Sequence, residues 1–310
     1  MIKQLRYKNI TWIDATAPSV EEIEKLADQY KIHPFITGDL KTPSPRSKIN
    51  LYKETIHLVC HFPAIDFFYN REPNNKPSSD HSLTEMVFII SQDFVISLHQ
   101  EPSPPLEELS KIFESGFNDL GENPNGSHLL YYLLRHLYLS LGNGLDLLGN
   151  ELKKTSHQVF AGREKEMVLA LANLNQHLMN FRWALKNHEE LLHSLNSTGS
   201  QLFGEDFHYY GQNLISEYNR VWYMLENYRE TFQDVQNTNN SLLSIKNNET
   251  VKILTVLAFI FLPISLVANF FSFTVSTPLE KSPYGLVIIL IIAIITLITT
   301  LSIAKYKKWL

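Results

Sequence analysis

Two long uncharged runs near the C-terminal end dominate the hydropathy pattern of the chain. The first covers residues 253–273, and the second covers residues 285–304. Because an α-helix rises about 1.5 Å per residue, each run is long enough to cross the ~30 Å hydrocarbon core of a bilayer. The pattern therefore predicts a transmembrane helical hairpin, in which residues 274–284 form the connecting loop.

Polar side chains in the first run lie on one side of the expected helix. Thr255, Ser265, Asn269 and Ser272 fall within an arc of about 100°, because successive residues turn by about 100°. Extended in both directions, this stripe steps by three and four residues, the spacing of about 3.5 that is typical of a helix facing its own copies. The polar stripe comprises Asn248, Val251, Thr255, Ala258, Leu262, Ser265, Asn269 and Ser272, and Leu254 lies beside it.

Polar groups that face lipid are costly, so the polar stripe should face protein or water. Two interpretations follow from this. Either the stripe lines a pore, or its Ser, Thr and Asn side chains form hydrogen bonds between packed helices. The periodicity alone leaves both interpretations open.

The composition excludes several classes of protein. The formal net charge of -5 gives no sign of the basic surface that nucleic-acid binding usually needs. Cys60 is the only cysteine, which excludes an intrachain disulfide and fits a reducing compartment. Residues 1–12 lack the apolar core of a signal peptide. The large part of the chain before residue 253 is therefore expected to be cytoplasmic.

Lysines flank the two uncharged runs unequally. The connecting loop carries only Glu280 and Lys281, whereas residues 305–310 form a basic tail and two lysines flank the start of the first run. The positive-inside rule then places both ends of the hairpin in the cytoplasm and the loop outside. The expected location is the cell membrane, crossed twice, with both termini cytoplasmic. The lysines on the cytoplasmic side are Lys246, Lys252, Lys305, Lys307 and Lys308.

Proline divides the soluble part into two regions. Eleven of the fourteen prolines lie at or before Pro124, and none lies between Asn125 and Leu262. Since proline breaks helix interiors, a mixed region is followed by a helical one. We expect an α/β domain at residues 1–126, a helical hairpin at 127–204, and a stalk helix at 205–273 that continues into the membrane.

In the first region, short segments carry the signals of strands and helices. Residues 10–12 and 55–61 are predicted strands, and residues 85–100 are a predicted hairpin that turns at 91–93. Ser19 and Glu22 have the spacing of a capping box, which would open a helix that ends near Tyr30. A layered α/β structure is expected from these elements. A further helix at 105–117 and a polar loop at 70–81 complete the region.

The second region is expected to contain three helical segments. Apolar residues recur every three or four positions over 129–160 and 163–195, and the run GSQLFG at 199–204 separates these from a third segment that begins near Asp206. This third segment has no proline before Pro263, so we expect one helix of about sixty residues, about 90 Å long. Such a helix needs neighbours, and copies of the chain would supply them.

Few side chains are arranged for catalysis or metal binding. His57 and His61 share one face of their predicted strand, with Cys60 on the other, because side chains alternate. A metal site there needs further ligands, which the nearby sequence does not provide, so a structural role is favoured. The sequence contains no Gly-rich phosphate loop, nucleophile elbow or HExxH motif, and we expect neither an enzyme nor a resident cofactor.

Several motifs occur in a recognisable order. Residues 248–255 read NETVKILT, residues 261–268 read FLPISLVA, and residues 307–310 read KKWL. Near the N-terminus, the chain carries Trp12-Ile13-Asp14, Pro18, Glu21-Glu22, His33-Pro34 and the stretch 45–52. In this order and spacing, the motifs resemble the CorA-type divalent metal cation (magnesium) channel/transporter family, with its NEVMKVLT, FLPLTLIA and KKWL segments, over nearly the full chain.

The resemblance implies an α+β membrane protein with an N-terminal α/β/α cytoplasmic domain, a long stalk helix and two C-terminal transmembrane helices. It implies a funnel-shaped homopentamer, whose central pore is lined by the first transmembrane helix of each copy. The transported ion would be Mg²⁺, with Co²⁺, Ni²⁺ or Zn²⁺ as further candidates. The partners would be other copies of the chain, the lipid bilayer and divalent cations. The resemblance favours pore lining over helix packing as the role of the polar stripe.

The outer end of the first run departs from the family pattern. Ser272-Phe273-Thr274 occupies the position of the family's Gly-Met-Asn signature, whose asparagine is taken to hold a hydrated Mg²⁺. Asn269, one turn inward on the polar stripe, is one candidate for binding the ion through its hydration water, and Thr274 is the other. The alternative function is a non-conducting membrane scaffold or sensor that keeps the fold without the signature.

A second departure concerns regulation. Members of the family often carry acidic residues around the upper stalk, which bind Mg²⁺ between subunits. In the matching stretch, residues 212–217, Glu217 is the only acidic residue. Since neutral amides bind a hard dication less strongly than carboxylates, metal gating of that kind is not expected here.

Overall fold

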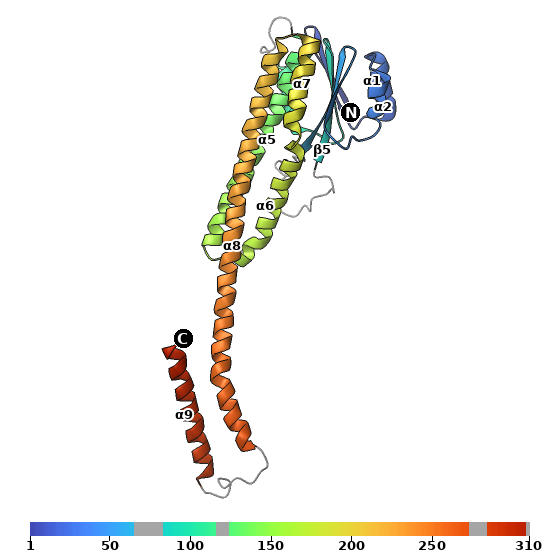
Figure 1. Ribbon diagram of the computed structural model, residues 1–310. Helices are drawn as coiled ribbons and strands as arrows, with labels where there is room; N and C mark the ends of the chain where they lie inside the picture. The colour runs from blue at the N-terminus through green and yellow to red at the C-terminus, as the bar shows by residue number, and fades with distance from the viewer. Residues whose placement is uncertain (65–82, 116–123, 273–283, 308–310) are drawn as a thin grey trace. The chain divides into compact units, whose positions relative to one another are not determined.

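The structure is a computed structural model that describes residues 1–64, 83–115, 124–272 and 284–307. The chain divides into two compact units, Met1–Val235 and Gln236–Leu310, and each is described by itself (Figure 1). Three expected features lie outside the described residues. These are the polar loop at 70–81, the loop at 274–284 except Tyr284, and the part of the basic tail after residue 307.

A six-stranded sheet forms the centre of the first unit. Its strand order is β1-β2-β6-β5-β4-β3, and neighbouring strands are antiparallel except for the parallel pair β2–β6. The predicted strands at 10–12 and 55–61 and the hairpin at 85–100 are confirmed, whereas β1 and β3 have no counterpart among the predicted strands. The strands are β1 (Ile2–Tyr7), β2 (Ile10–Thr16), β3 (Lys48–Tyr52), β4 (Thr55–Pro63), β5 (Leu83–Ile90) and β6 (Phe94–His99).

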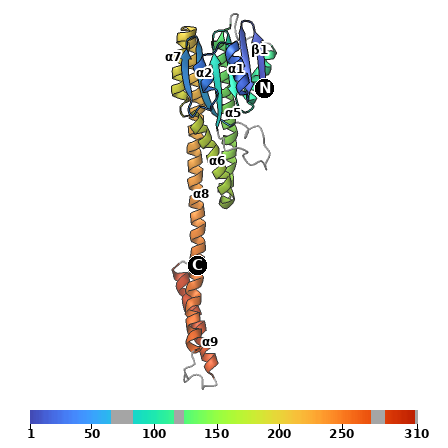
Figure 2. The ribbon, with the colours of Figure 1, turned by 90° about the vertical axis from the view of Figure 1, so that its right-hand side faces the viewer.

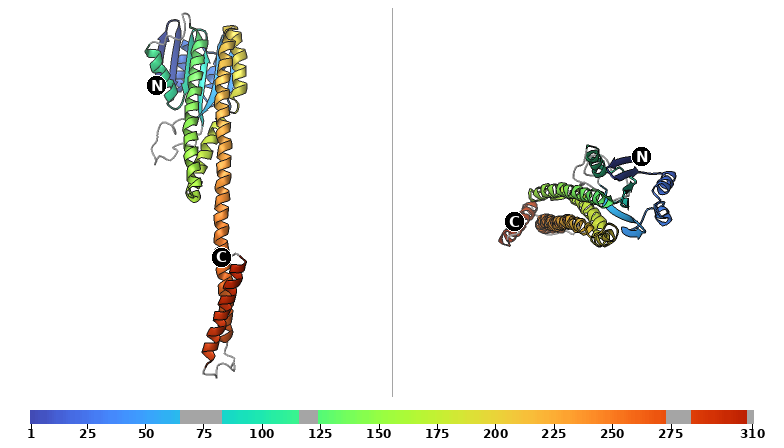
Figure 3. Two further views of the ribbon diagram at one scale, coloured as in Figure 1. Left: turned by 90° about the vertical axis from the view of Figure 1, so that its left-hand side faces the viewer. Right: turned by 90° about the horizontal axis from the view of Figure 1, so that it is seen from above.

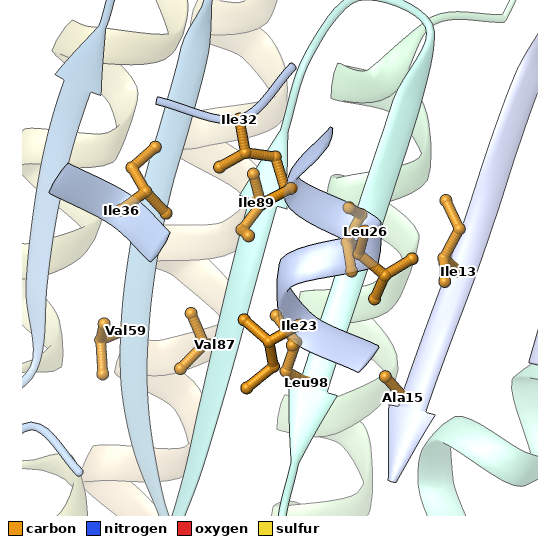
Figure 4. Packing of buried hydrophobic residues seen from close by; sticks show 12 residues of the cluster. Ile13, Ala15, Ile23, Leu26, Ile32, Ile36, Val59, Val87, Ile89 and Leu98 are labelled. Carbon is orange, nitrogen blue, oxygen red and sulfur yellow. The ribbon is translucent and has the colours of Figure 1, made fainter. Parts of the chain in front are cut away.

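Two short helices, α1 (Val20–Gln29) and α2 (Pro34–Asp39), cover one face of the sheet (Figures 1 and 3). The predicted capping box of α1 is confirmed, because Glu22 N–H donates to Ser19 Oγ at 3.2 Å and Ser19 N–H donates to Glu22 Oε2 at 2.8 Å. Beneath the two helices lies a core of buried aliphatic side chains (Figure 4). It includes Ile13, Ala15, Ile23, Leu26, Ile32, Ile36, Val59, Val87, Ile89 and Leu98.

Longer helices cover the other face of the sheet, so the expected α/β/α layering is confirmed (Figure 3). Phe62 of β4 marks this face, because its ring contacts Tyr138 and His188 from two of these helices. The helix α4 (Pro104–Glu114) packs against α5 and β1. The helices that follow it are α5 (Gly126–Phe160), α6 (Glu164–Leu185) and α7 (His188–Phe203).

The expected helical hairpin at 127–204 contains three helices, because the chain breaks between α6 and α7 at Lys186 and Asn187. The predicted break at 199–204 is confirmed only at its end, because α7 continues past Gly199 to Phe203 and the chain leaves the helix at residues 204–206. Gly199 lies in this helix for a packing reason, since a Cβ there would lie only 2.1 Å from a ring carbon of Phe207. Gly204, with φ of 90°, ends the helix.

A buried polar contact accounts for the break before α7. Nδ1 of His188 accepts a hydrogen bond from the Tyr138 hydroxyl at 2.9 Å, and Nε2–H donates to the backbone oxygen of His61 at 3.0 Å. Burial lowers the pKa of His188 to about 4, so the ring is neutral and can accept at one nitrogen while it donates at the other. These bonds tie the start of α7 to α5 and to strand β4.

The third expected helical segment is a single helix of 66 residues, α8 (Phe207–Ser272), which contains Pro263. The expectation of one long helix that begins near Asp206 is therefore confirmed. In the second unit, α9 (Gly285–Tyr306) runs beside the last part of α8 (Figures 1 and 2). Within the described residues, one helix, Phe207–Val267, has the length and apolar composition to cross a membrane, and Leu290–Tyr306 is a shorter apolar segment.

Candidate functional site

The polar stripe is exposed along the last part of α8. Val251, Leu254 and Leu262 keep 53%, 60% and 68% of their surface exposed, although they are apolar. No described part of the chain covers this side of the helix. The other members whose side chains the structure describes are also exposed, namely Asn248, Thr255, Ala258, Ser265 and Asn269.

The covered side of α8 is the opposite one. Val256 is 5% exposed, and Phe259, Ile260, Pro263, Ile264 and Val267 are partly buried. At about 100° per residue, the centre of this covered side lies about 150° around the helix from the centre of the stripe. The neighbouring helix α9 has its own buried positions, Thr300 and Ala304. The pairing of α9 with α8 therefore leaves the polar stripe uncovered.

The exposed stripe extends further along α8 than the sequence analysis predicts. Counting back from Asn248 in alternating steps of four and three residues, every position as far as Tyr209 is exposed. Tyr209 and Tyr223 are 71% and 73% exposed. The alternating spacing could have identified these positions from the sequence. In this part of α8, however, most residues are polar, so hydropathy does not distinguish one side of the helix from another. The added positions are Ser244, Ser241, Asn237, Asp234, Glu230, Asn227, Tyr223, Arg220, Ser216, Asn213 and Tyr209.

The polar groups on the stripe are neutral in the apolar part of α8. Thr255 Oγ1 donates to the backbone oxygen of Val251 at 2.7 Å, which leaves its lone pairs available to accept from water. Asn269 is exposed on the same face. Phe273 and Thr274 lie outside the described residues, and so does the side chain of Ser272. The assignment of an ion to Asn269 or Thr274 therefore stays a prediction.

Glu217, the acidic residue of the upper stalk, is paired within its own chain. Its carboxylate oxygens lie 3.6 Å from Arg135 Nε and 3.0 Å from Arg220 Nη2. A carboxylate beside two guanidinium groups competes poorly for a divalent cation, because the local charge is already balanced. This pairing is a further reason to expect no metal gating at this position.

The two histidines of β4 have different surroundings. His61 is hydrogen-bonded, with Nδ1 at 3.1 Å from Ser47 Oγ and Nε2 at 3.0 Å from the Ser44 backbone oxygen. His57 is 1% exposed, and neither of its ring nitrogens has a hydrogen-bond partner in the described part of the chain. Cys60 is buried on the other face, and burial raises the pKa of its thiol, so it is not a nucleophile. Among the described residues, no three His, Cys, Asp or Glu side chains form a metal-binding group.

A buried network of side chains joins the parallel strands β2 and β6. Trp12 Nε1–H donates to Ser97 Oγ at 2.9 Å, and Ser97 Oγ–H donates to Asp14 Oδ1 at 2.5 Å. His99 Nε2 lies 3.2 Å from the same carboxylate oxygen, and Nδ1 lies 2.5 Å from the Glu101 backbone oxygen. These are the residue types of a hydrolase triad, but the serine is bonded to the aspartate and not to the histidine. The imidazole does not accept the serine proton, so the arrangement differs from a triad and we interpret the network as structural.

We expect His99 to make the stability of the protein depend on pH. Both ring nitrogens face acceptors, so the ring is best satisfied as an imidazolium ion. Burial by itself lowers the pKa of His99, but the hydrogen bond and charge of Asp14, the Glu101 carbonyl and the charge of Glu107 together raise it. A raised folded-state pKa stabilises the fold fully below the unfolded pKa of about 6.5, and this stabilisation is lost as the pH rises through the folded value.

Thermal unfolding of the purified protein at a series of pH values tests this. The melting temperature should fall as the pH rises above about 6.5, and His99→Gln should remove this slope while costing about 3 kcal/mol at low pH. His193→Gln, at an exposed position of α7, is the matched control and should behave as the wild type. Equal slopes in wild type and His99→Gln would contradict the assignment. His57 and His188 have pKa values lowered to about 4, so they change the stability only as the pH falls below about 6.5 and do not contribute to the slope above it.

The chain and its fold are similar to those of known proteins. The Cobalt/magnesium transport protein CorA of Thermotoga maritima is 20% identical over 97% of this chain and 83% of its own length. The protein of the same name from Methanocaldococcus jannaschii is 20% identical over 97% of this chain and 92% of its own length. The complete structure of the CorA magnesium transporter from Methanocaldococcus jannaschii has the same fold, with a TM-score of 0.78 at 19% identity, over 97% of this chain and 92% of that one.

The family model described as CorA-like Mg²⁺ transporter protein matches residues 7–308. The match covers the sheet from β2 onward, the long helix α8 and the helix α9, and so reaches into both units of the structure. The resemblance seen in the sequence motifs is confirmed, and the expectation that the protein is not an enzyme is confirmed with it. The chain belongs to the CorA-like Mg²⁺ transporter family, whose members are divalent-cation transporters.

Proposed function

We propose that this protein is a divalent-cation channel or transporter of the cell membrane that conducts through a central pore lined by α8. Mg²⁺ is the proposed principal ion, and Co²⁺, Ni²⁺ and Zn²⁺ are further candidates. The observation that carries the proposal is the polar stripe, which is exposed, has a spacing of about 3.5 residues, and lies on the side of α8 opposite the covered one. The names of two relatives, which refer to cobalt and magnesium transport, support the choice of ions.

The chemistry of the stripe suits a hydrated dication. Mg²⁺ gives up its water slowly, so a pore must pass it with much of its hydration shell in place. From Asn248 to Ser272, the stripe offers hydroxyl and carboxamide groups and no charged side chain. Such groups can donate to and accept from the bound water without holding the ion too tightly to release it.

The proposed assembly is a funnel-shaped homopentamer with the stripe of each copy toward the common axis. Residues 253–273 and 285–304 would cross the membrane, with the loop outside and both termini in the cytoplasm. The proposed division of the chain keeps the boundaries expected from the sequence. These are 1–126, 127–204, 205–273, 274–284, 285–304 and 305–310.

The oligomeric state is open to direct measurement. A complex of five chains, each of 35.8 kDa, should be found by mass measurement of the purified protein in mild detergent. The reason is that the exposed stripe and the long helix α8 both need neighbours. A monomer or dimer under conditions that preserve the fold would remove the proposed central pore.

Cation flux into liposomes tests the function itself. Vesicles that carry the purified protein should take up Mg²⁺ faster than empty vesicles, and the same assay with Co²⁺, Ni²⁺ and Zn²⁺ would rank the ions. Absence of flux for all four ions, with intact pentamers in the vesicles, would favour the non-conducting scaffold or sensor. The check for intact pentamers is essential, because Ser272-Phe273-Thr274 replaces the Gly-Met-Asn signature and a loss of conduction is the alternative.

A further inference from the structure

His57 is buried on β4, the strand next to the edge strand β3, and has no hydrogen-bond partner among the described residues. Its side chain is 1% exposed, and both ring nitrogens are unsatisfied within the described residues. An unsatisfied buried polar group typically costs about 1–3 kcal/mol, so a native structure that contains one needs an explanation. Burial, and then the charge of Lys48, lower the pKa of His57 to about 4 against the opposing charge of Asp39. At neutral pH the ring is therefore uncharged and has a nitrogen lone pair available.

A carboxylate lies close to this lone pair. Asp39, the last residue of α2, has Oδ2 at 3.9 Å from His57 Nδ1. This distance is too long for a hydrogen bond. Two ligands of one tetrahedral ion are about 3.4 Å apart when each lies about 2.1 Å from the metal. The nitrogen and the oxygen are thus within about half an ångström of the separation that a shared metal ion requires.

Strand β3, which pairs with the strand of His57, supplies a further possible metal ligand and a lysine that is ion-paired with Asp39. Asn50 lies directly opposite His57 in the antiparallel register of β3 and β4, so both side chains share one face. Lys48, two residues away on β3, places Nζ 2.7 Å from Asp39 Oδ2. The side chains of Lys48 and Asp39 are 35% and 40% exposed, so the ion pair is open to solvent. An incoming ion can reach the carboxylate by displacing the lysine.

We propose that His57, Asp39 and Asn50 form a binding site for a divalent transition-metal ion of the Zn²⁺, Ni²⁺ and Co²⁺ class, which takes the place of the Lys48 ammonium group. An imidazole ligand favours these ions over Mg²⁺, which prefers oxygen ligands in a nearly ideal octahedron. The site lies in the soluble unit and does not depend on the proposed pore. It would give that unit its own response to transition metals, separate from the ion that crosses the membrane.

The test uses the full-length protein in detergent, in excess Mg²⁺ so that oxygen-rich sites are occupied. The protein is titrated with Co²⁺, and binding is monitored by the visible absorption of cobalt bound to protein ligands. The titration should show one saturable site per chain. His57→Gln should weaken this binding at least tenfold, because the imidazole is lost. Lys48→Met should strengthen it about tenfold, because the competing ammonium group and its repulsion of the metal are removed. His193→Gln, at an exposed position of α7, should bind as the wild type does.

The two opposite shifts make the result decisive. A packing effect at the buried histidine could weaken binding in His57→Gln, but it would not strengthen binding in the Lys48 variant, whose change is at a partly exposed position. Unchanged cobalt affinity in either variant would overturn the site. Cation flux is measured on the same variants. Cobalt binding and flux are separate readouts, so a failure of the proposed channel activity would not be mistaken for a failure of the metal site.

Discussion

Replacement of Leu262 with serine should raise divalent-cation flux about tenfold, which corresponds to a barrier lower by about 1.4 kcal/mol. Leu262 lies on the polar stripe and is 68% exposed, with Leu254 and Ala258 on or beside the same side of α8. In the proposed assembly these side chains form apolar rings around a narrow pore. Such rings exclude water and so block a hydrated ion, and a hydroxyl ring would let water in.

Leu257→Ser is the matched control for this experiment. Leu257 is also an exposed leucine of α8, but it lies five residues from Leu262 and therefore about 140° around the helix. The same chemical change there should leave flux unchanged, since the side chain faces away from the proposed axis. If Leu262→Ser pentamers conduct as the wild type does, the barrier lies elsewhere in the pore.

Replacement of Asn269 with alanine should lower Mg²⁺ flux at least tenfold. Five carboxamides at this level of the proposed pore could both donate to and accept from the hydration shell of the ion, whereas alanine can do neither. The loss of hydrogen bonds worth about 1–3 kcal/mol is enough for an effect of this size. Asn269 is exposed on the stripe, which is the position that this role requires.

Comparison with Thr274→Ala in the same flux assay, at equal pentamer yield, separates the two candidate rings. We expect the Thr274 variant to keep both its flux and its ion preference. The competing role for Asn269 is a hydrogen bond between neighbouring helices, which would change pentamer yield and leave the flux per pentamer unchanged. Loss of selectivity in the Thr274 variant together with normal conduction in the Asn269 variant would show that the assignment is wrong.

The parts of the fold that follow from local patterns were predictable from the sequence. The long helix α8 was expected because no proline interrupts it before Pro263, and α1 was expected from the capping box of Ser19 and Glu22. The polar stripe was identified from Asn248 onward by its spacing alone, and its role stays a prediction. In each case, the deciding information lies within a few turns of the chain.

The features that were missed depend on contacts between distant residues. The break before α7 is held by His188, Tyr138 and the carbonyl of His61, which lie on three different elements. The glycine at 199 resembles a helix breaker in sequence, but it lies inside α7, where the ring of Phe207 leaves no room for a Cβ. The approach of Asp39 to His57 likewise comes from the placement of α2 over the sheet, which no local pattern indicates.

In the proposed assembly, the spacing of the polar stripe also determines how the copies of α8 wind around one another. An ideal α-helix has about 3.6 residues per turn, so a stripe with a spacing of 3.5 drifts by about 20° in every seven residues. From Asn248 to Ser272 the stripe spans about three and a half such repeats, and on a straight helix it would drift by about 70° around the surface. Copies that keep the stripe toward one axis over this length have to coil around one another as a left-handed superhelix, so each α8 begins and ends at different angular positions around the axis.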